Sequence, residues 1–233
     1  LSEKLLTSSS FDGGKRDQQF EKLLSKFVKS KFAVAVNSGT AALQASLYAI
    51  DIKPGDEVLV PSFTFVATAN SVKSVGAKPI FVDILKDNYT MDPEDLKKKI
   101  TRRTKAIIPV HLYGHMAYMY EILEIAKKKN IKIIEDASQS LGSKLKGKHS
   151  GTFSDLGCFS LYGGKIITSG EGGAIVTNDK KLFEKLKQVR NHGLAKNNLI
   201  TTLGLNLRLS ELSASIAKIQ MKKLPRLLSQ RKK

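Results

Sequence analysis

Short β-rich runs and helical patterns alternate along most of this chain, and the alternation restricts the folds open to it. Strands are predicted at 32–36, 57–60, 79–82, 105–110, 131–135, 156–161 and 173–177. Helices are predicted at 40–50, 65–75, 92–100, 118–129, 180–189 and 209–223. This rhythm indicates a mostly parallel, seven-stranded sheet with helices on both faces, which is a three-layer α/β/α fold.

Polar and aromatic residues follow several of the predicted strands. Ser38 to Thr40 follow the first strand, Phe63 and Phe65 the second, His111 the fourth and Asp136 the fifth. In open sheets of this class, ligands bind beyond the carboxyl ends of the strands. We therefore expect these residues to surround a binding site.

Asp136 and Lys165 are the candidate catalytic pair. Asp136 ends the apolar run 131–135, and Lys165 lies in a Gly-rich loop. A loop lysine can hold an aldehyde as a Schiff base, and a strand-end aspartate can keep a pyridine nitrogen protonated, so the pair predicts a pyridoxal 5′-phosphate (PLP) enzyme. Taken alone, Asp136 also fits an N-cap or a structural ion pair, and Lys165 fits a surface lysine. Their occurrence in order with a phosphate seat favours the cofactor.

The phosphate seat is predicted at 37–43, where a strand, a tight turn and a helix opening follow one another. Free N–H groups and the helix dipole attract phosphate at such a place, and the Thr40 hydroxyl adds a donor. An ordinary N-cap ahead of an Ala-rich helix has the same appearance. Ser160 is either a further phosphate donor or a buried strand serine.

Gln139 and Phe65 complete the set predicted from the residues. Gln139, one helical turn after Asp136, either contacts the ring hydroxyl region or is a solvated helix residue. Phe65 either stacks on a flat ring or packs in the core. Cys158 is expected in the core. The four histidines show no metal-ligand spacing, and no metal site is proposed.

The composition bears on partners and location. The chain has 39 Lys and Arg against 21 Asp and Glu, a formal net charge of +18. Lysine runs lie at the ends of two predicted helices, where they are solvated, and no nucleic-acid-binding motif accompanies them, so a nucleic-acid partner is disfavoured. A basic field still attracts nucleotide diphosphates. A single cysteine and the lack of a bilayer-length apolar run favour a cytoplasmic protein without a membrane partner.

A set of motifs spread over nearly the whole chain is highly specific in combination. They lie at 37–43, 53–58, 61–70, 76–79, 82–83, 109–114, 134–137, 159–173 and 204–209. With them the chain resembles the DegT/DnrJ family of nucleotide-sugar aminotransferases, which are fold-type I PLP enzymes. The segment 162–168 is most similar to the GDP-perosamine synthase branch of that family.

The resemblance implies a role for each candidate. Lys165 would bind the cofactor covalently and shuttle protons, and Asp136 would pair with the pyridine nitrogen. The implied cofactor contacts are Gly39, Thr40, Ala41, Phe65, Asp136, Gln139, Ser160, Lys165 and Asn206. Asn206 would reach the cofactor of a partner subunit, so a homodimer with shared active sites is implied. The implied reaction transfers an amino group from an amino acid, expected to be glutamate, to a keto-sugar nucleotide in amino-sugar and surface-polysaccharide biosynthesis.

Length is where the chain departs from the family. Family members carry a smaller C-terminal domain after a long interdomain helix, and this chain ends inside that region. We expect a PLP-binding large domain at 1–210, with the start of the interdomain helix and a truncated C-terminal region at 211–233. The small domain would be largely missing. The alternative function is therefore a catalytically impaired PLP-fold protein that acts as a dimerising or regulatory subunit.

Overall fold

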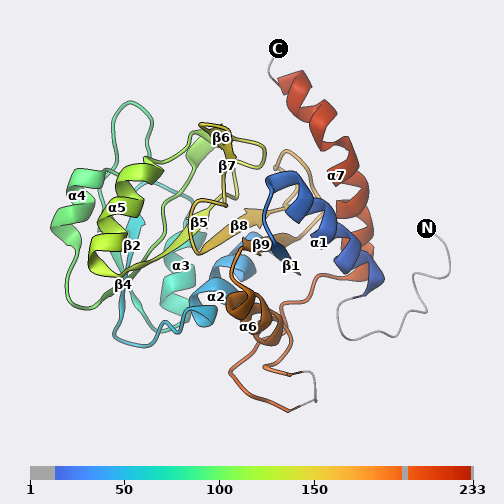
Figure 1. Ribbon diagram of the computed structural model, residues 1–233, viewed down its shortest axis with the longest axis horizontal. Coiled ribbons are helices and arrows are strands. Elements are labelled where there is room, and N and C mark those ends of the chain that lie inside the picture. Colours follow the sequence, from blue (N-terminus) through green and yellow to red (C-terminus); the bar gives the residue numbers. More distant parts are fainter. Residues whose placement is uncertain (1–13, 196–198, 232–233) are drawn as a thin grey trace.

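The computed structural model describes residues 14–195 and 199–231, and it consists of one large sheet between two layers of helices (Figure 1). The strands of the large sheet are β1 (Phe32–Val36), β2 (Glu57–Pro61), β3 (Lys78–Val82), β4 (Thr104–Ile107), β5 (Lys132–Asp136), β8 (Leu156–Ser160) and β9 (Gly173–Thr177). A small hairpin is formed by β6 (Lys144–Leu145) and β7 (Lys148–His149). The helices are α1 (Lys15–Val28), α2 (Gly39–Ala49), α3 (Ala67–Ser74), α4 (Pro93–Lys99), α5 (Met119–Lys129), α6 (Lys180–Arg190) and α7 (Glu211–Arg231), with a 3₁₀ turn at Leu112–Gly114.

The strand order in the large sheet is β1-β9-β8-β5-β4-β2-β3. The pairings from β8 through β5, β4 and β2 to β3 are parallel, while β9 is antiparallel to both of its neighbours. Only β9 therefore runs against the other strands, and the prediction of a mostly parallel seven-stranded sheet is confirmed. Since the other six strands share one direction, their carboxyl ends meet along one edge.

Alternate residues of β1 pack on opposite faces of the sheet. Val34 and Val36 pack into the cluster that includes the buried side of α2, whereas Ala33 and Ala35 pack toward α1 and α7. Successive strand residues point to opposite faces, so a run in which both sets are apolar must be covered on both sides. The helices supply that cover, and α4 and α5 pack on the part of the second face that β5, β4, β2 and β3 form.

The N-terminal helix α1 is an element that the sequence analysis did not predict. Its buried residues Phe20, Leu24 and Val28 repeat at the i, i+4, i+8 spacing of an amphipathic helix. They pack beside α7, as the adjacent blue and red helices in Figure 1 show. The apolar spacing was therefore present in the sequence.

The last helix differs from its predicted end at residue 223. α7 continues through Pro225 to Arg231. A proline inside a helix removes one N–H donor and crowds the carbonyl four residues earlier. A helix is therefore expected to end before a proline. Here Met221 and Leu224 are buried against α1, and this packing offsets the cost. None of the helices within the described part of the chain is long and apolar enough to cross a bilayer.

Candidate active site

A cavity of about 320 Å³ lies at the edge where the carboxyl ends of the parallel strands meet. Its lining comes from the start of α2, the β2–α3 connection, the ends of β5 and β8, and the loop after β8. The lining residues are Ser38, Gly39, Thr40, Leu43, Thr64, Phe65, Ala67, Thr68, Val110, Asp136, Ser138, Gln139, Ser160, Tyr162, Lys165 and Glu171. The set includes seven of the nine predicted cofactor contacts, so tertiary structure gathers residues that are far apart in sequence.

Asp136 is the buried acid of this cavity, with 6% of its surface exposed. The Thr68 hydroxyl donates to its Oδ2 at 3.0 Å, and the Ser138 N–H donates to its Oδ1 at 3.1 Å. No ion pair to Asp136 forms within residues 14–195 and 199–231, and no helix follows it directly. The alternatives of a structural ion pair and an N-cap are therefore wrong. A buried carboxylate with neutral donors only is suited to a cationic N–H in the cavity.

The opening of α2 is an anion seat. The Ser38 side chain caps the helix by accepting from the Ala41 N–H at 3.0 Å, so the ordinary N-cap interpretation is correct as well. The first N–H groups of the helix still point out of it without partners inside it. Gly39 allows close approach here, because a Cβ at this position would lie 2.8 Å from Ser160 Cβ. The seat thus combines a helix N-terminus with the Ser160 and Ser138 side chains nearby.

Lys165 lies in the turn after β8, where its N–H donates to the Tyr162 carbonyl at 3.0 Å. The residue is half-buried and lines the cavity together with Glu171. No carboxylate in the described ranges forms an ion pair with its Nζ. These features argue against the surface-lysine alternative, since an amine that reaches a cavity without a paired carboxylate is available for chemistry.

Phe65 and Gln139 both reach the cavity. Phe65 is 69% exposed, so the alternative of a core aromatic is wrong. Gln139 is not on a helix as predicted, because residues 138–139 form a turn after β5. Its Oε1 accepts the N–H of Tyr113 at 3.0 Å, and Tyr113 has φ of 52°. Among the residues that the structure describes, the amide nitrogen of Gln139 has no acceptor, so it can donate to a ligand in the cavity.

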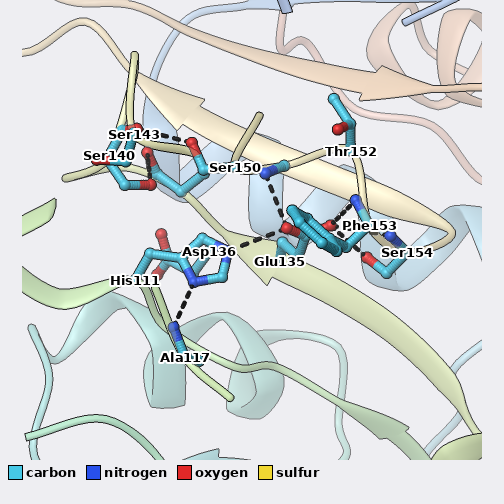
Figure 2. A network of polar contacts seen from close by, with 12 residues as sticks. His111, Ala117, Glu135, Asp136, Ser140, Ser143, Ser150, Thr152, Phe153 and Ser154 are labelled. Atoms are coloured by element: carbon cyan, nitrogen blue, oxygen red, sulfur yellow. Dashed lines mark hydrogen bonds and ion pairs between the residues drawn. The ribbon is translucent and has the colours of Figure 1, made fainter. Parts of the chain in front are cut away.

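Four residues that the sequence analysis expected at the site do not line the cavity. Phe63 is exposed and its ring packs against Tyr89 instead. The Ala41 N–H is already bonded to Ser38 Oγ. Asn206 is exposed and lies beside Asn37, whose side-chain amide donates to its carbonyl at 3.4 Å. His111, expected at the ligand edge, is fully buried against Glu135 (Figure 2). Its backbone follows β4 as predicted, but its side chain does not join the cavity lining.

Thr68 and Ser138 are the polar residues that the sequence analysis missed. Both bond Asp136, yet Thr68 is 68 residues away from it and sits inside a helix pattern. Small hydroxyl residues are frequent in helices, so no sequence signal separates Thr68 from ordinary helix residues. Ser138 follows Asp136 by two residues, the spacing of an Asx turn, and that spacing was a usable signal.

The comparisons with known proteins agree with this geometry. The family model of the DegT/DnrJ/EryC1/StrS aminotransferase family matches residues 2–233. A GDP-perosamine synthase of Escherichia coli O157:H7 is 41% identical over 217 residues, which is 92% of this chain and 60% of that protein. A dTDP-3-amino-3,4,6-trideoxy-alpha-D-glucose transaminase of Streptomyces venezuelae is 40% identical over 94% of this chain and 58% of its own length.

A solved structure of Spr1654 from Streptococcus pneumoniae, in its PLP-form, superposes with a TM-score of 0.91. It is 30% identical, and the match covers 98% of this chain and 64% of that one. The chain spans about 60% of the length of the curated relatives it matches. A family match over nearly every residue, together with relatives above 30% identity, leads to one conclusion. The chain belongs to the DegT/DnrJ/EryC1/StrS aminotransferase family.

Proposed function

We propose that this chain is the cofactor-binding part of a PLP-dependent aminotransferase that transfers an amino group from an amino acid, glutamate in our proposal, to a keto-sugar nucleotide. The observation that carries the proposal is a single cavity lined by Asp136, Lys165 and the N-terminus of α2. A buried acid, an unpaired amine and an anion seat are the three groups that PLP requires of its protein. The reaction belongs to amino-sugar and surface-polysaccharide biosynthesis in this proposal, and the single buried cysteine fits a cytoplasmic setting.

The cavity fits the cofactor in size and in chemistry. Its volume of about 320 Å³ lies within the ~300–1,000 Å³ common for small-molecule sites. Asp136, fixed by two donors and lacking a cation within the described residues, would accept the pyridine N–H. The first turn of α2, with Thr40 and Ser160, would hold the phosphate. Phe65, exposed at the cavity wall, would cover one face of the ring.

Lys165 is the proposed catalytic base and acid. When bound, PLP supplies the electron sink that lets an α-hydrogen of the amino donor leave as a proton. Lys165 Nζ is the only amine among the lining residues, so it is the group that holds the cofactor and then carries that proton. Because Lys165 and Asp136 both line the cavity, this set favours an enzyme over the alternative of an impaired regulatory subunit.

A second cavity supports the substrate part of the proposal. It has a volume of about 440 Å³ and shares Ser138, Gln139, Ser160 and Lys165 with the first. Arg231 at the end of α7 also lines it, so an anionic substrate would find both room and a cation in the cavity that the reactive lysine lines. The matched relatives from Escherichia coli and Streptomyces are named for GDP- and dTDP-linked sugars, which supports a sugar nucleotide as the acceptor.

Covalent labelling tests the cofactor assignment. The chain is incubated with PLP, reduced with borohydride and digested, and the pyridoxyl group is mapped by mass spectrometry. We expect the label on Lys165, and no label at this peptide in Lys165→Arg. The matched control is Lys105→Arg, an exposed strand lysine, which should label like the parent. A label on another lysine, or none in folded parent protein, would overturn the assignment.

We also propose a homodimer with shared active sites, in which the cofactor-binding domain ends at residue 210, just ahead of α7. Asn206 is exposed and lies outside the cavity of its own chain, as a residue that serves a partner's site would. A symmetric pair would bring it to the second cofactor. Sedimentation with and without PLP tests this, and a strictly monomeric PLP-bound protein would exclude a shared site. Turnover of a keto-sugar nucleotide with glutamate then tests the reaction.

A further inference from the structure

Glu135 lies one residue before Asp136 and is fully buried, yet it does not line the cavity. Its Oε1 accepts from the N–H of Phe153 at 2.7 Å, from the N–H of Ser154 at 2.9 Å and from the Ser154 hydroxyl at 2.9 Å. Its Oε2 accepts from the Gly151 N–H at 2.8 Å and from His111 Nε2 at 2.9 Å (Figure 2). Both oxygens act only as acceptors, so a single carboxylate joins two other segments of the chain, His111 and 151–154, to the end of β5.

Only one tautomer of the His111 ring is compatible with its two hydrogen bonds. The Ala117 N–H donates to Nδ1 at 3.1 Å, so Nδ1 carries the lone pair and Nε2 carries the proton. The ring is fully buried and cannot exchange these partners for water. Glu135 therefore faces a fixed donor, and only an acceptor in its place satisfies both the ring and the Gly151 N–H.

The backbone of Asp136 directly follows Glu135 and is hydrogen-bonded to the segment that carries His111. The Asp136 N–H donates to the Pro109 carbonyl at 2.9 Å, and the His111 N–H donates to the Asp136 carbonyl at 3.0 Å. His111 is thus bonded twice to the end of β5, through its backbone to Asp136 and through its ring to Glu135. Successive strand residues point to opposite faces, so Glu135 holds the strand end from the side away from the cavity.

The same network reaches the turn that carries Gln139. Ser150 directly precedes Gly151, and its hydroxyl donates to the Ser140 carbonyl at 2.7 Å. Its N–H donates to the Ser143 carbonyl at 3.0 Å. The segment that Glu135 anchors is therefore joined to the 138–143 turn, and Figure 2 shows the Ser140, Ser143 and Ser150 side chains close together.

We propose that Glu135 is a positioning residue for the cofactor site. Its carboxylate locks His111 and the 151–154 backbone around the end of β5. Through these bonds it sets the position of Asp136 and of the turn that carries Gln139. The proposal rests on the proposed function, because Asp136 and Gln139 matter as cofactor contacts only if PLP binds here. The glutamate itself touches neither cofactor nor substrate.

Glu135→Gln tests the proposal, with Glu57→Gln as the matched control. Glu57 is also a buried strand glutamate with hydroxyl and arginine donors, from Thr101 and Arg103, but it lies at the opposite end of the sheet. In Glu135→Gln the new NH₂ group faces N–H donors whichever way the amide is turned. The hydrogen bonds on that side of the side chain are therefore lost. Both variants should unfold at lower temperature than the parent, since each loses a buried carboxylate.

Only Glu135→Gln should weaken PLP binding, by about 10-fold or more, and shift the absorption band of bound PLP, while Glu57→Gln stays within about twofold of the parent. Hydrogen exchange without cofactor gives an independent readout: peptides covering 136–143 should exchange faster in Glu135→Gln and unchanged in Glu57→Gln. A parent chain that fails to bind PLP would count against the proposed function, and the exchange result would still decide whether Glu135 holds this segment.

Folded Glu135→Gln with parental affinity, spectrum and exchange would overturn the proposal. So would equal loss of PLP affinity in both variants, because the effect would then be one of general stability. If Glu135→Gln does not fold, His111→Gln decides the matter, since it leaves Glu135 its four backbone and hydroxyl donors. We expect faster exchange at 136–143 in this milder variant, and parental exchange there would refute the positioning role.

Discussion

The Thr68 hydroxyl donates to Asp136 Oδ2 at 3.0 Å and so connects helix α3 to the end of strand β5. Thr68 is 1% exposed and its oxygen also lies 3.3 Å from Thr64 Oγ1. With Ser138 bonded to Oδ1, each oxygen of the carboxylate has one donor. The acid is therefore fixed in rotation before any ligand arrives, which is the arrangement that oriented binding requires.

Thr68→Val tests that fixation. The substitution keeps the shape of the side chain and removes its donor, so Asp136 loses one of two restraints. We expect PLP affinity to fall by about 3- to 30-fold, with a stability loss of about 1 kcal/mol, as measured by titration and by chemical unfolding. Thr68→Ser retains the hydroxyl and serves as the control. Equal affinities for the Val and Ser variants would show that the hydroxyl does not orient Asp136.

Asp136→Asn should retain some PLP and lose the reaction with glutamate. An amide cannot hold a proton on the pyridine nitrogen, so the electron sink is weakened and the rate should fall by about 100-fold or more. The rate is followed by the loss of PLP absorbance when glutamate is added. Asp155→Asn is the control, because Asp155 bonds Lys132 and Ile133 at the opposite end of the same strand. Near-parental conversion in Asp136→Asn would contradict the assigned role.

Gly39→Ala should damage the phosphate seat. The added Cβ would lie 2.8 Å from Ser160 Cβ and 3.1 Å from its Oγ, so either α2 or the end of β8 must shift. We expect PLP affinity to fall by about 10-fold or more, because the N–H groups of the first turn then point elsewhere. Gly163→Ala is the control, since a Cβ there meets nothing within 4 Å although the residue is close to Lys165 in sequence. Parental affinity in Gly39→Ala would place the phosphate elsewhere.

The pH dependence of stability should report on Asp17 in α1. Burial, opposed by Arg190 and assisted by Glu21 and Glu211, raises its pKa to about 7 from 3.8. Its Oδ1 has no hydrogen-bond partner in the part of the chain that the structure describes. Because the folded-state pKa exceeds the unfolded one, the folded protein keeps a proton that the unfolded chain loses. This group therefore makes the free energy of unfolding fall between about pH 4 and about pH 7.

Asp17→Asn removes that titration. We expect the variant to be more stable than the parent at about pH 8 by roughly 1–3 kcal/mol, and its stability to vary less between about pH 5 and about pH 8. Urea unfolding at several pH values measures both. Asp87→Asn, at an exposed loop aspartate, should follow the parent curve. A parallel pH dependence in the parent and Asp17→Asn would show that Asp17 keeps an ordinary pKa.

The sequence by itself determined the order of the seven sheet strands and of the helices that follow β1, the mostly parallel sheet, and seven predicted cofactor contacts that line the cavity. Strand and helix patterns are local, and the carboxyl ends of parallel strands must share an edge, so Asp136 and the α2 N-terminus were predictable neighbours. Helix ends were less predictable. The end of α7 lies beyond Pro225 because Met221 and Leu224 pack on α1, and that contact is not local.

Tertiary structure alone decided which polar groups satisfy one another. His111 lies shortly after β4 and Asp136 is the last residue of β5, but the ring of His111 is buried against Glu135 whereas Asp136 faces the cavity. Thr68 and Asp136 are 68 residues apart, and no spacing rule connects them. Hydrogen-bond partners depend on distances of a few tenths of an ångström between segments that only the packed fold brings together. Sequence patterns specify the face of the sheet or helix on which a residue lies. The packing of these faces against one another specifies which hydrogen-bond partners that residue contacts.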